Sequence, residues 1–280
     1  MKLLPVEFDL MRAYVEKHCG IHLDPGKEYL IETRLTDLVI EKGCRSFLEF
    51  HAAALADSSG KLRDRIVDAM TTNETYFFRD ETLWTYMKDV AVPQLLKRAA
   101  STGSARVWSA AASTGQEAYS IAMLVDEVAR SQGTPQLARN VEIVGTDISS
   151  AALFLALSGR YDSLAIRRGL SDERRKRYFR EDGSVWVLDE EIRKRARFKR
   201  FNLMDSFAAL GQFDLVLCRY VAIYFQDDFK KDLFTRIGGV LRPGSHLLLG
   251  ATESLRGYAG GFAAEVYRNC TYYVRQGGGP

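Results

Sequence analysis

The chain has 280 residues, of which 46% are apolar and 27% charged, and its formal net charge is +3. This composition is typical of a globular protein and excludes a disordered or collagen-like chain. The longest apolar runs, Phe213 to Cys218 and His246 to Gly250, are too short to cross a bilayer, and the amphipathic, early-acidic N-terminus is unlike a secretory signal.

Cysteine and histidine residues form no metal or disulfide pattern. Four cysteines are scattered without paired spacing, as in a reducing compartment: Cys19, Cys44, Cys218 and Cys270. His18 and His22 are four residues apart, but no third ligand is near, and zinc sites need three or four. We therefore expect a cytoplasmic protein with no metal site. We also expect a monomer.

Residues 1–70 are predicted to form a small all-α domain. Apolar residues recur there at helical spacing, punctuated by glycines such as Gly20 and Gly43, and no alternating strand pattern occurs. We expect residues 71–90 to be a linker that contributes to the functional site. Residues 91–280 are predicted to form a second, larger domain.

From Arg106 onward, strand and helix patterns alternate. Apolar runs predict strands over 106–112, 141–146, 198–201, 213–218 and 245–250. Amphipathic stretches predict helices over 117–130, 149–158 and 228–237, the last ended by Gly238-Gly239. Two further runs, 262–267 and 270–274, flank Arg268-Asn269 like a hairpin. This order predicts an α/β fold with a doubly wound, mostly parallel sheet and an antiparallel terminal hairpin.

The segment from Arg160 to Arg200 is basic, with fourteen Lys or Arg and eight Asp or Glu. Such a segment is either a solvated face or a docking surface for an acidic protein or a nucleic acid. We interpret residues 160–197 as an insertion in the larger domain. Only Val185 to Leu188 is strand-like within it, so we expect no complete small sheet there.

The segment VWSAAASTGQE, Val107 to Glu117, predicts a ligand site. An apolar strand ends in small residues and one glycine, and a carboxylate follows where a helix begins, so a ligand can approach the backbone closely. The segment has neither G-x-G-x-x-G spacing nor a G-K-[ST] ending. We therefore expect a nucleoside-like ligand without phosphates, of the adenosylmethionine type.

Two further strand ends carry polar groups suited to such a ligand. Asp147 is placed to accept hydrogen bonds from both ribose hydroxyls. The alternative interpretation of Asp147 is a helix cap. Asn202 and Leu203 offer an amide and an apolar side chain to an adenine ring. Because ligands of open α/β sheets bind beyond the carboxyl ends of the strands, we expect these groups to share one pocket.

Five segments resemble the chemotaxis-receptor glutamate O-methyltransferase (CheR) family, and the match covers nearly the whole chain. They are GIHLDPGKEYLIETRL (20–35), TTNETYFFR (71–79), VWSAAASTGQEAYSIAM (107–123), GTDIS (145–149) and FDLVLCRYVAIYF (213–225). The resemblance implies an adenosylmethionine-dependent methyltransferase fold. It also implies S-adenosyl-L-methionine (SAM) as methyl donor, S-adenosyl-L-homocysteine (SAH) as product, and receptor glutamates as acceptors that become methyl esters.

The resemblance also implies site residues. Carried onto matching positions, the cofactor contacts are Asn73, Thr75, Arg79, Glu117, Asp147, Asn202, Leu203, Tyr220 and Val221. Arg79 is expected to hold the cofactor's carboxylate, because a guanidinium forks onto carboxylates. Tyr224 is expected to orient the acceptor carboxylate, with a packed strand-end aromatic as its alternative, and Arg98 is the candidate basic partner.

Tyr220 is the main departure from the family pattern, which usually places Asn there; Gln116, Ala118 and Asp37 also differ. Because a phenol stands in that position, an alternative interpretation is a family member that binds a receptor or another signalling protein without transferring methyl groups. A nucleic-acid methyltransferase using the basic segment is a further alternative, although the [DNS]-P-P-[YF] element of amino-group methylation is missing at Arg219 to Ala222.

The expected partner is the acidic cytoplasmic helical bundle of a chemoreceptor. We expect the basic segment to dock on it, and Arg174, Arg175 and Arg177 are the side chains singled out for this contact. Some relatives carry a small sheet here that grips a receptor's C-terminal peptide. Since that sheet looks incomplete in this sequence, we expect recognition that does not use a receptor tether.

Overall fold

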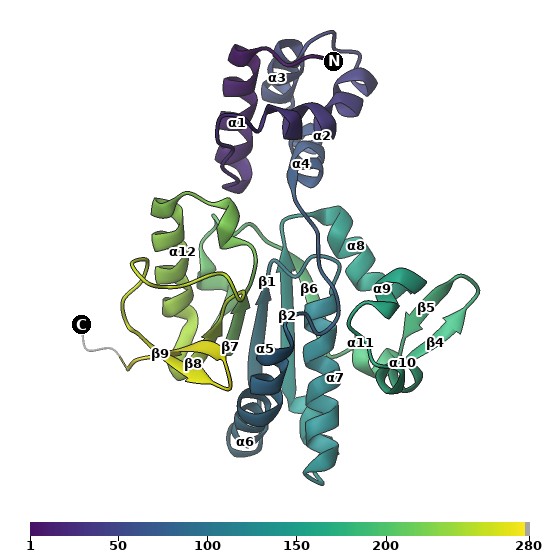
Figure 1. The fold of residues 1–280 in the computed structure, drawn as a ribbon, viewed down its shortest axis with the longest axis vertical. Coiled ribbons are helices and arrows are strands. Elements are labelled where there is room, and N and C mark those ends of the chain that lie inside the picture. The colour runs from purple at the N-terminus through teal and green to yellow at the C-terminus, as the bar shows by residue number, and fades with distance from the viewer. Residues whose placement is uncertain (278–280) are drawn as a thin grey trace.

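A bundle of helices forms the N-terminal part of the chain and lies above the sheet in Figure 1. The computed structural model describes residues 1–277. The bundle consists of α1 (Pro5–Cys19), α2 (Glu28–Glu41), α3 (Phe47–Ala56) and α4 (Lys61–Met70). Their apolar faces meet in a core of their own, which includes Met11, Ile31, Phe47 and Ile66. α1 ends at Gly20, whose φ of 74° turns the chain away from the helix axis.

A seven-stranded sheet forms the centre of the larger part, in the order β6-β2-β1-β7-β8-β10-β9. Its strands are β1 (Ala105–Ala110), β2 (Val141–Asp147), β6 (Ala196–Arg200), β7 (Phe213–Cys218), β8 (Leu241–Leu248), β9 (Phe262–Tyr267) and β10 (Cys270–Arg275). β6, β2, β1, β7 and β8 pair in parallel, whereas β10 is antiparallel to both β8 and β9. This confirms the predicted doubly wound sheet with an antiparallel terminal hairpin. The strand order reverses at β1, which is where such sheets bind ligands.

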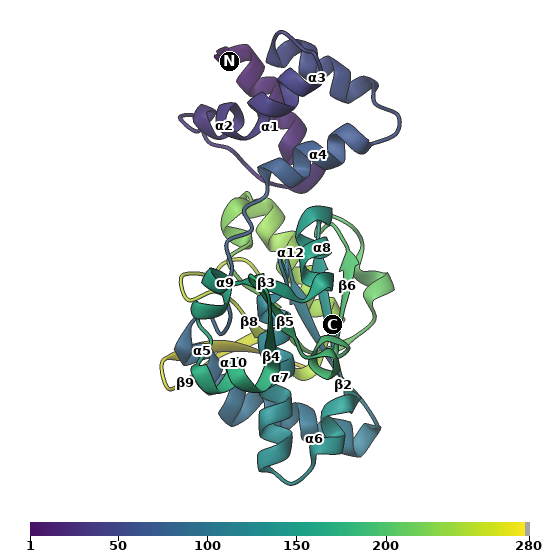
Figure 2. The same ribbon diagram turned by 90° about the vertical axis from the view of Figure 1, so that its right-hand side faces the viewer.

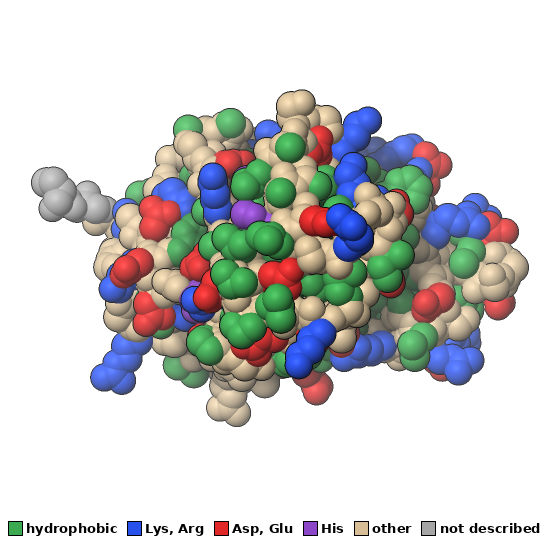
Figure 3. Space-filling model, turned by 90° about the horizontal axis from the view of Figure 1, so that it is seen from above, with side chains coloured by type: hydrophobic (Ala, Val, Ile, Leu, Met, Phe, Trp, Pro, Cys, Tyr) green, Lys and Arg blue, Asp and Glu red, His purple; other side chains and the backbone are tan. Residues whose placement is uncertain are grey.

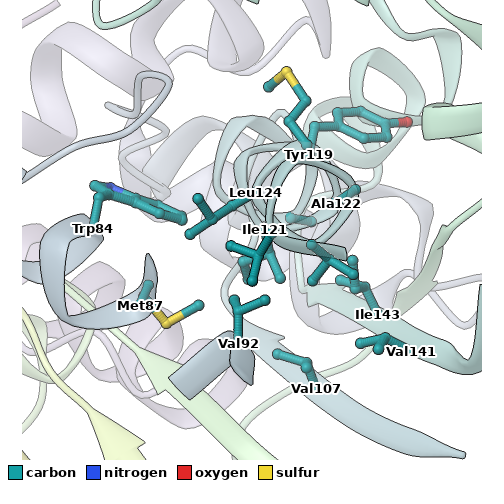
Figure 4. Packing of buried hydrophobic residues seen from close by; sticks show 14 of the residues in the cluster. Trp84, Met87, Val92, Val107, Tyr119, Ile121, Ala122, Leu124, Val141 and Ile143 are labelled. Atoms are coloured by element: carbon teal, nitrogen blue, oxygen red, sulfur yellow. The ribbon is translucent and has the colours of Figure 1, made fainter. Parts of the chain in front are cut away.

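Helices cover both faces of this sheet (Figures 1 and 2). They are α5 (Glu81–Tyr86), the π-helical turn η1 (Met87–Ala91), α6 (Val92–Thr102), α7 (Gln116–Ser131), η2 (Pro135–Asn140), η3 (Phe207–Leu210), η4 (Ala222–Tyr224) and α12 (Asp227–Val240). Alternate residues of β1 serve the two faces: Val107 packs with α6 and α7, and Trp108 packs with α12 and η3. Figure 4 shows the first of these cores, where Val107 lies beneath Ile121 of α7 and beside Val92 of α6.

A second, three-stranded antiparallel sheet lies between α8 (Ser150–Ser158) and β6, in the order β3-β5-β4. This insertion comprises β3 (Arg160–Asp162), α9 (Ser163–Arg167), α10 (Asp172–Tyr178), β4 (Phe179–Asp182), β5 (Val185–Leu188) and α11 (Glu190–Arg193). The prediction of no complete small sheet is therefore wrong. β3 and β4 are three and four residues long and rich in charge, so only β5 shows a strand pattern in the sequence. The expectation that the chain recognises a receptor without using a receptor tether depended on an incomplete sheet and is therefore no longer supported.

α12 continues through Gly238 and Gly239 to Val240, so the predicted helix end is wrong. Gly238 lies against the ring of Phe262, where an added Cβ would come within 3.3 Å, and this packing supports the helix despite its glycines. No helix among residues 1–277 is long and apolar enough to span a membrane.

Candidate active site

One cavity collects the predicted site residues at the carboxyl ends of β1, β2 and β7, beneath the helical bundle. Its lining includes Asn73, Thr75, Arg79, Glu117, Asp147, Asn202, Leu203, Tyr220, Val221 and Tyr224. Cys19 and Ile21, at the end of α1, close it from the bundle side. The segment 71–80 that joins the bundle to the sheet therefore forms one wall, and both parts of the chain contribute to the site.

Arg98 is not part of this cavity. It lies on α6, where its Nε is 2.5 Å from Oδ1 of Asp214 near the start of β7. The start of a parallel strand lies at the opposite edge of the sheet from the site. The prediction of Arg98 as a basic partner for the acceptor is therefore wrong, because the side chain neutralises a carboxylate that is 7% exposed at the far edge.

The turn after β1 brings the backbone close to the cavity. Ala111 and Ser113 have φ of 57° and 52°, a left-handed conformation that small side chains tolerate at modest cost. Gly115 has φ of 93°, and a Cβ there would come within 3.0 Å of the Ala156 side chain on α8. This tight turn exposes backbone groups to a ligand, as the segment VWSAAASTGQE predicts.

Asp147 is fixed at the end of β2 by two backbone groups. The N–H of Ser113 donates to its Oδ2 and the N–H of Ser149 to its Oδ1, each at 2.8 Å. Burial raises the pKa of Asp147, and these hydrogen bonds oppose that shift. Ser149 caps α8 through its own hydroxyl, which accepts from Ala152 N–H, so the carboxylate of Asp147 is held by the loop and not used as the cap.

Glu117 and Arg219 form a buried network at the floor of the cavity. Oε1 of Glu117 accepts from the Ser109 hydroxyl at 2.7 Å, and Oε2 accepts from Nη1 of Arg219 at 2.7 Å. Nη2 of Arg219 donates to Asp80 at 2.6 Å and to the carbonyl of Arg79 at 2.9 Å. The Arg219 side chain is 3% exposed, so this network ties the 71–80 segment to β7 and to α7.

Sequence reasoning did not find Arg219 or Asp80 as site residues. The one signal in the sequence was the position of Arg219, directly after the apolar strand 213–218. A cation there is buried only if carboxylates meet it. Its partners are 102 and 139 residues away in the chain, beyond the reach of any local pattern.

The guanidinium of Arg79 lies over the ring of Tyr220 on the cavity wall. The Arg79 guanidinium carbon is 3.6 Å from the centre of the Tyr220 ring. The Tyr220 hydroxyl donates to Asp80, and burial followed by this hydrogen bond raises the pKa of Tyr220. Nη1 of Arg79 donates to the carbonyl of Glu74, and no carboxylate within residues 1–277 forms an ion pair with Arg79.

Asn202, Leu203 and Tyr224 lie where the helical bundle meets the sheet. Nδ2 of Asn202 donates to the carbonyl of His18 at 2.8 Å, and its Oδ1 accepts from Met204 N–H. One N–H of this amide remains for a ligand. The carbonyl of Tyr224 accepts from His22 N–H at 2.9 Å, which holds this residue beside the cavity.

The donor set fits an adenosyl group joined to an amino acid. A fixed, buried carboxylate at Asp147 suits the ribose hydroxyls, and Ile148, Phe201 and Leu203 supply apolar lining beside it. Arg79 offers a guanidinium that no carboxylate of the described residues holds. No cluster of three or more His, Cys, Asp or Glu suited to a metal occurs within residues 1–277.

This fold and pocket define the chain as a SAM-dependent methyltransferase. Residues 73–268 match the family described as CheR methyltransferase, SAM binding domain, and residues 6–71 match the CheR methyltransferase all-alpha domain. The chain therefore belongs to the CheR methyltransferase family, and SAM is its cofactor.

Known chemotaxis methyltransferases resemble the chain over most of its length. It is 45% identical to chemotaxis protein methyltransferase Cher2 of Pseudomonas putida, with 90% of this chain and 91% of that protein covered. It is 44% identical to chemotaxis protein methyltransferase 1 of Pseudomonas aeruginosa, with 91% and 92% covered. It is 41% identical to the chemotaxis protein methyltransferase of Vibrio parahaemolyticus, with 90% of each covered.

Proposed function

We propose that this chain transfers the methyl group of SAM to glutamate side chains of a chemoreceptor, forming methyl esters and releasing SAH. The observation that carries the proposal is the combination of a cofactor pocket with Arg79 and Tyr224 on its wall and no histidine in its lining. The one thiol there, Cys19, is 5% exposed and donates to the carbonyl of Val15, and burial raises its pKa to about 11. The pocket therefore offers no histidine and no readily ionised thiol as a general base.

A carboxylate acceptor does not need one. A glutamate side chain with a pKa near ~4.3 is already an anionic nucleophile at neutral pH. The cofactor supplies a methyl group bonded to a positively charged sulfonium. The residues then have to align the two partners and exclude water, and such alignment can lower a barrier by about 7 kcal/mol or more.

Each side chain has a proposed role in this alignment. Asp147 holds the ribose, and Leu203 and Val221 contact the adenosyl group, with Asn202 at the adenine edge. Arg79 holds the carboxylate of the cofactor's amino-acid end, with Asn73 and Thr75 beside it on the same segment. Glu117 and Arg219 support this wall from below. The Tyr224 hydroxyl orients the acceptor carboxylate.

The proposed partner is the cytoplasmic helical bundle of a chemoreceptor, and the proposed state is a cytoplasmic monomer. The basic insertion supplies a docking surface, but with different side chains from those predicted. Arg174 pairs with Glu127, Arg175 with Asp172, and Arg177 with Asp126. Exposed Lys or Arg residues of the insertion without an acidic partner among residues 1–277 are Arg167, Lys176 and Arg180. Lys199, on the neighbouring β6, is exposed and unpaired in the same way.

Transfer of labelled methyl from SAM to receptor-enriched membranes tests the proposal. We expect label on the receptor band that mild base releases as methanol, because esters hydrolyse there and methyl amines do not. Asp147→Ala is the control variant and should lose transfer. Base-stable label would contradict ester formation. SAH binding without any transfer would instead favour the alternative of a receptor-binding module.

A further inference from the structure

Tyr220 occupies a backbone conformation that its side chain does not favour. Its φ is 56°, in the left-handed region that Asn tolerates better than an aromatic residue does. The neighbouring loop holds it there, since Oε2 of Glu253 accepts from Tyr220 N–H at 2.6 Å and from Gly250 N–H at 2.9 Å. The direction of the Tyr220 side chain is therefore set by the backbone.

The ring is also fixed at its outer end. The Tyr220 hydroxyl donates to Asp80, which Arg219 holds in turn, and accepts from Ala251 N–H at 3.3 Å. A ring anchored at both ends presents one rigid face to the guanidinium of Arg79. The ring lies closest to a cation that otherwise has one hydrogen bond, to the Glu74 carbonyl, and a more distant ring, Tyr76, with its centre 5.6 Å away.

We propose that Tyr220 is a positioning residue for cofactor binding: its ring orients Arg79 so that the guanidinium edge faces the carboxylate of SAM or SAH. A guanidinium stacked on a ring keeps its N–H donors in its own plane, parallel to the ring, where they are free for a forked contact with a carboxylate. The phenol, which is larger than the family's usual Asn, is then part of the binding wall. This inference rests on the proposed role of Arg79 and on no assumption about the acceptor.

Calorimetry with SAH on the full-length chain tests this role, with three variants. Tyr220→Leu removes the aromatic face and should weaken SAH binding by up to about tenfold, because Arg79 must then be ordered when the ligand binds. Tyr220→Phe keeps the face, loses only the hydroxyl, and should bind SAH within about threefold of the wild type. Tyr220→Asn should bind as weakly as Tyr220→Leu, with an unchanged or higher melting temperature, because Asn relieves the left-handed backbone.

A double-mutant cycle separates positioning from general damage. In an Arg79→Ala background, Tyr220→Leu should change SAH affinity by less than about twofold, because the stacked partner is already gone. In methyl-transfer assays, Tyr220→Leu should raise KM for SAM and leave KM for the receptor unchanged.

Three results would overturn the inference. The first is tighter SAH binding by Tyr220→Asn, which would mean that the ring obstructs the pocket. The second is that Tyr220→Leu weakens SAH binding in the Arg79→Ala background as much as in the wild type. The third is that Tyr220→Leu raises KM for the receptor and leaves KM for SAM unchanged. Because SAH binding needs no acceptor, loss of the ester chemistry alone would refute the proposed function and leave the role of Tyr220 standing.

Discussion

At the scale of single residues, the site depends on which charges are already paired. Arg219 is neutralised by Glu117 and Asp80, so it serves as a structural tie within the wall. Arg79 has no such partner among residues 1–277 and remains available to an anion. Both side chains are arginines, so their roles differ because of pairing: the paired Arg219 supports the pocket, and we propose that the unpaired Arg79 binds the cofactor.

Tyr224 provides the test of acceptor alignment. Tyr224→Phe removes one hydroxyl and keeps the ring, so the cavity and the His22 contact to the Tyr224 carbonyl should persist. We expect kcat for receptor methylation to fall about 10- to 100-fold, the range of one lost hydrogen bond to a charged group. SAH affinity measured by calorimetry should stay within about twofold. Unchanged kcat would instead assign Tyr224 to packing.

Local patterns could predict part of this site, and the reason for the rest is physical. Asp147 and the turn after β1 follow strand ends, which a sequence shows directly. The Asp80–Arg219–Glu117 network depends on long-range contacts, and the Arg98–Asp214 pair at the far edge depends on where α6 packs. Neither arrangement has a local signature in the chain.

At the scale of elements, the insertion is tied to the sheet domain by ion pairs. Asp126 on α7, 2% exposed at its side chain, meets Arg130, Arg177 and Arg195. Figure 3 shows acidic and basic side chains interspersed at its right-hand end, where Figure 1 places β4 and β5. Much of the positive charge that a residue count reveals is therefore engaged in holding the insertion in place.

Short strands explain why the sequence did not predict the small sheet of the insertion. Each strand of the β3-β5-β4 sheet has three or four residues, and its pairing is set by backbone hydrogen bonds across the sheet. Its apolar side, including Tyr161 and Phe179, packs on Phe77 of the 71–80 segment with ring centres 5.0 and 5.6 Å apart. This contact connects the insertion to the wall of the site.

Two arginines of the insertion form a matched pair for testing the docking surface. Arg174 forks onto Glu127 and lies 3.7 Å from the Phe78 ring centre, whereas Arg180 is exposed without an acidic partner among the described residues. Arg174→Glu should lower the free energy of unfolding by about 1–3 kcal/mol, since it also places two carboxylates together. Arg180→Glu, with the same charge change, should leave thermal unfolding unchanged within 1–2 °C.

The receptor assay then isolates docking. Arg180→Glu should raise KM for the receptor about threefold at low salt, with SAH affinity unchanged, and the difference should shrink as ionic strength rises. A KM equal to that of the wild type at every salt concentration would argue against docking through this face.

At the scale of the whole molecule, the helical bundle lies above the sheet domain (Figure 2). The cofactor pocket is lined by residues of both parts. Direct contacts across this junction include the Asn202 amide on the His18 carbonyl, His22 N–H on the Tyr224 carbonyl, and the Arg200–Asp64 ion pair at 2.6 Å. Small shifts of the bundle therefore change the shape of the pocket.

Gly20 provides the sharpest test of this coupling. It ends α1 next to Cys19 of the pocket, and an added Cβ would come within 2.7 Å of the Phe229 ring on α12. Gly43 has the same φ of 74°, but an added Cβ there meets no atom of the described chain within 4 Å. Both substitutions to alanine carry the same backbone strain, about 1 kcal/mol or more, so they differ in the clash alone.

Gly20→Ala should displace the bundle from α12 and weaken SAH binding about tenfold, while circular dichroism shows an unchanged helix content. Gly43→Ala should lose similar stability in thermal unfolding, yet bind SAH like the wild type. Calorimetry on both variants makes the comparison. Equal SAH affinities would mean that the Phe229 ring moves aside and that the junction does not control the pocket, because a flexible side chain would then absorb the added methyl group.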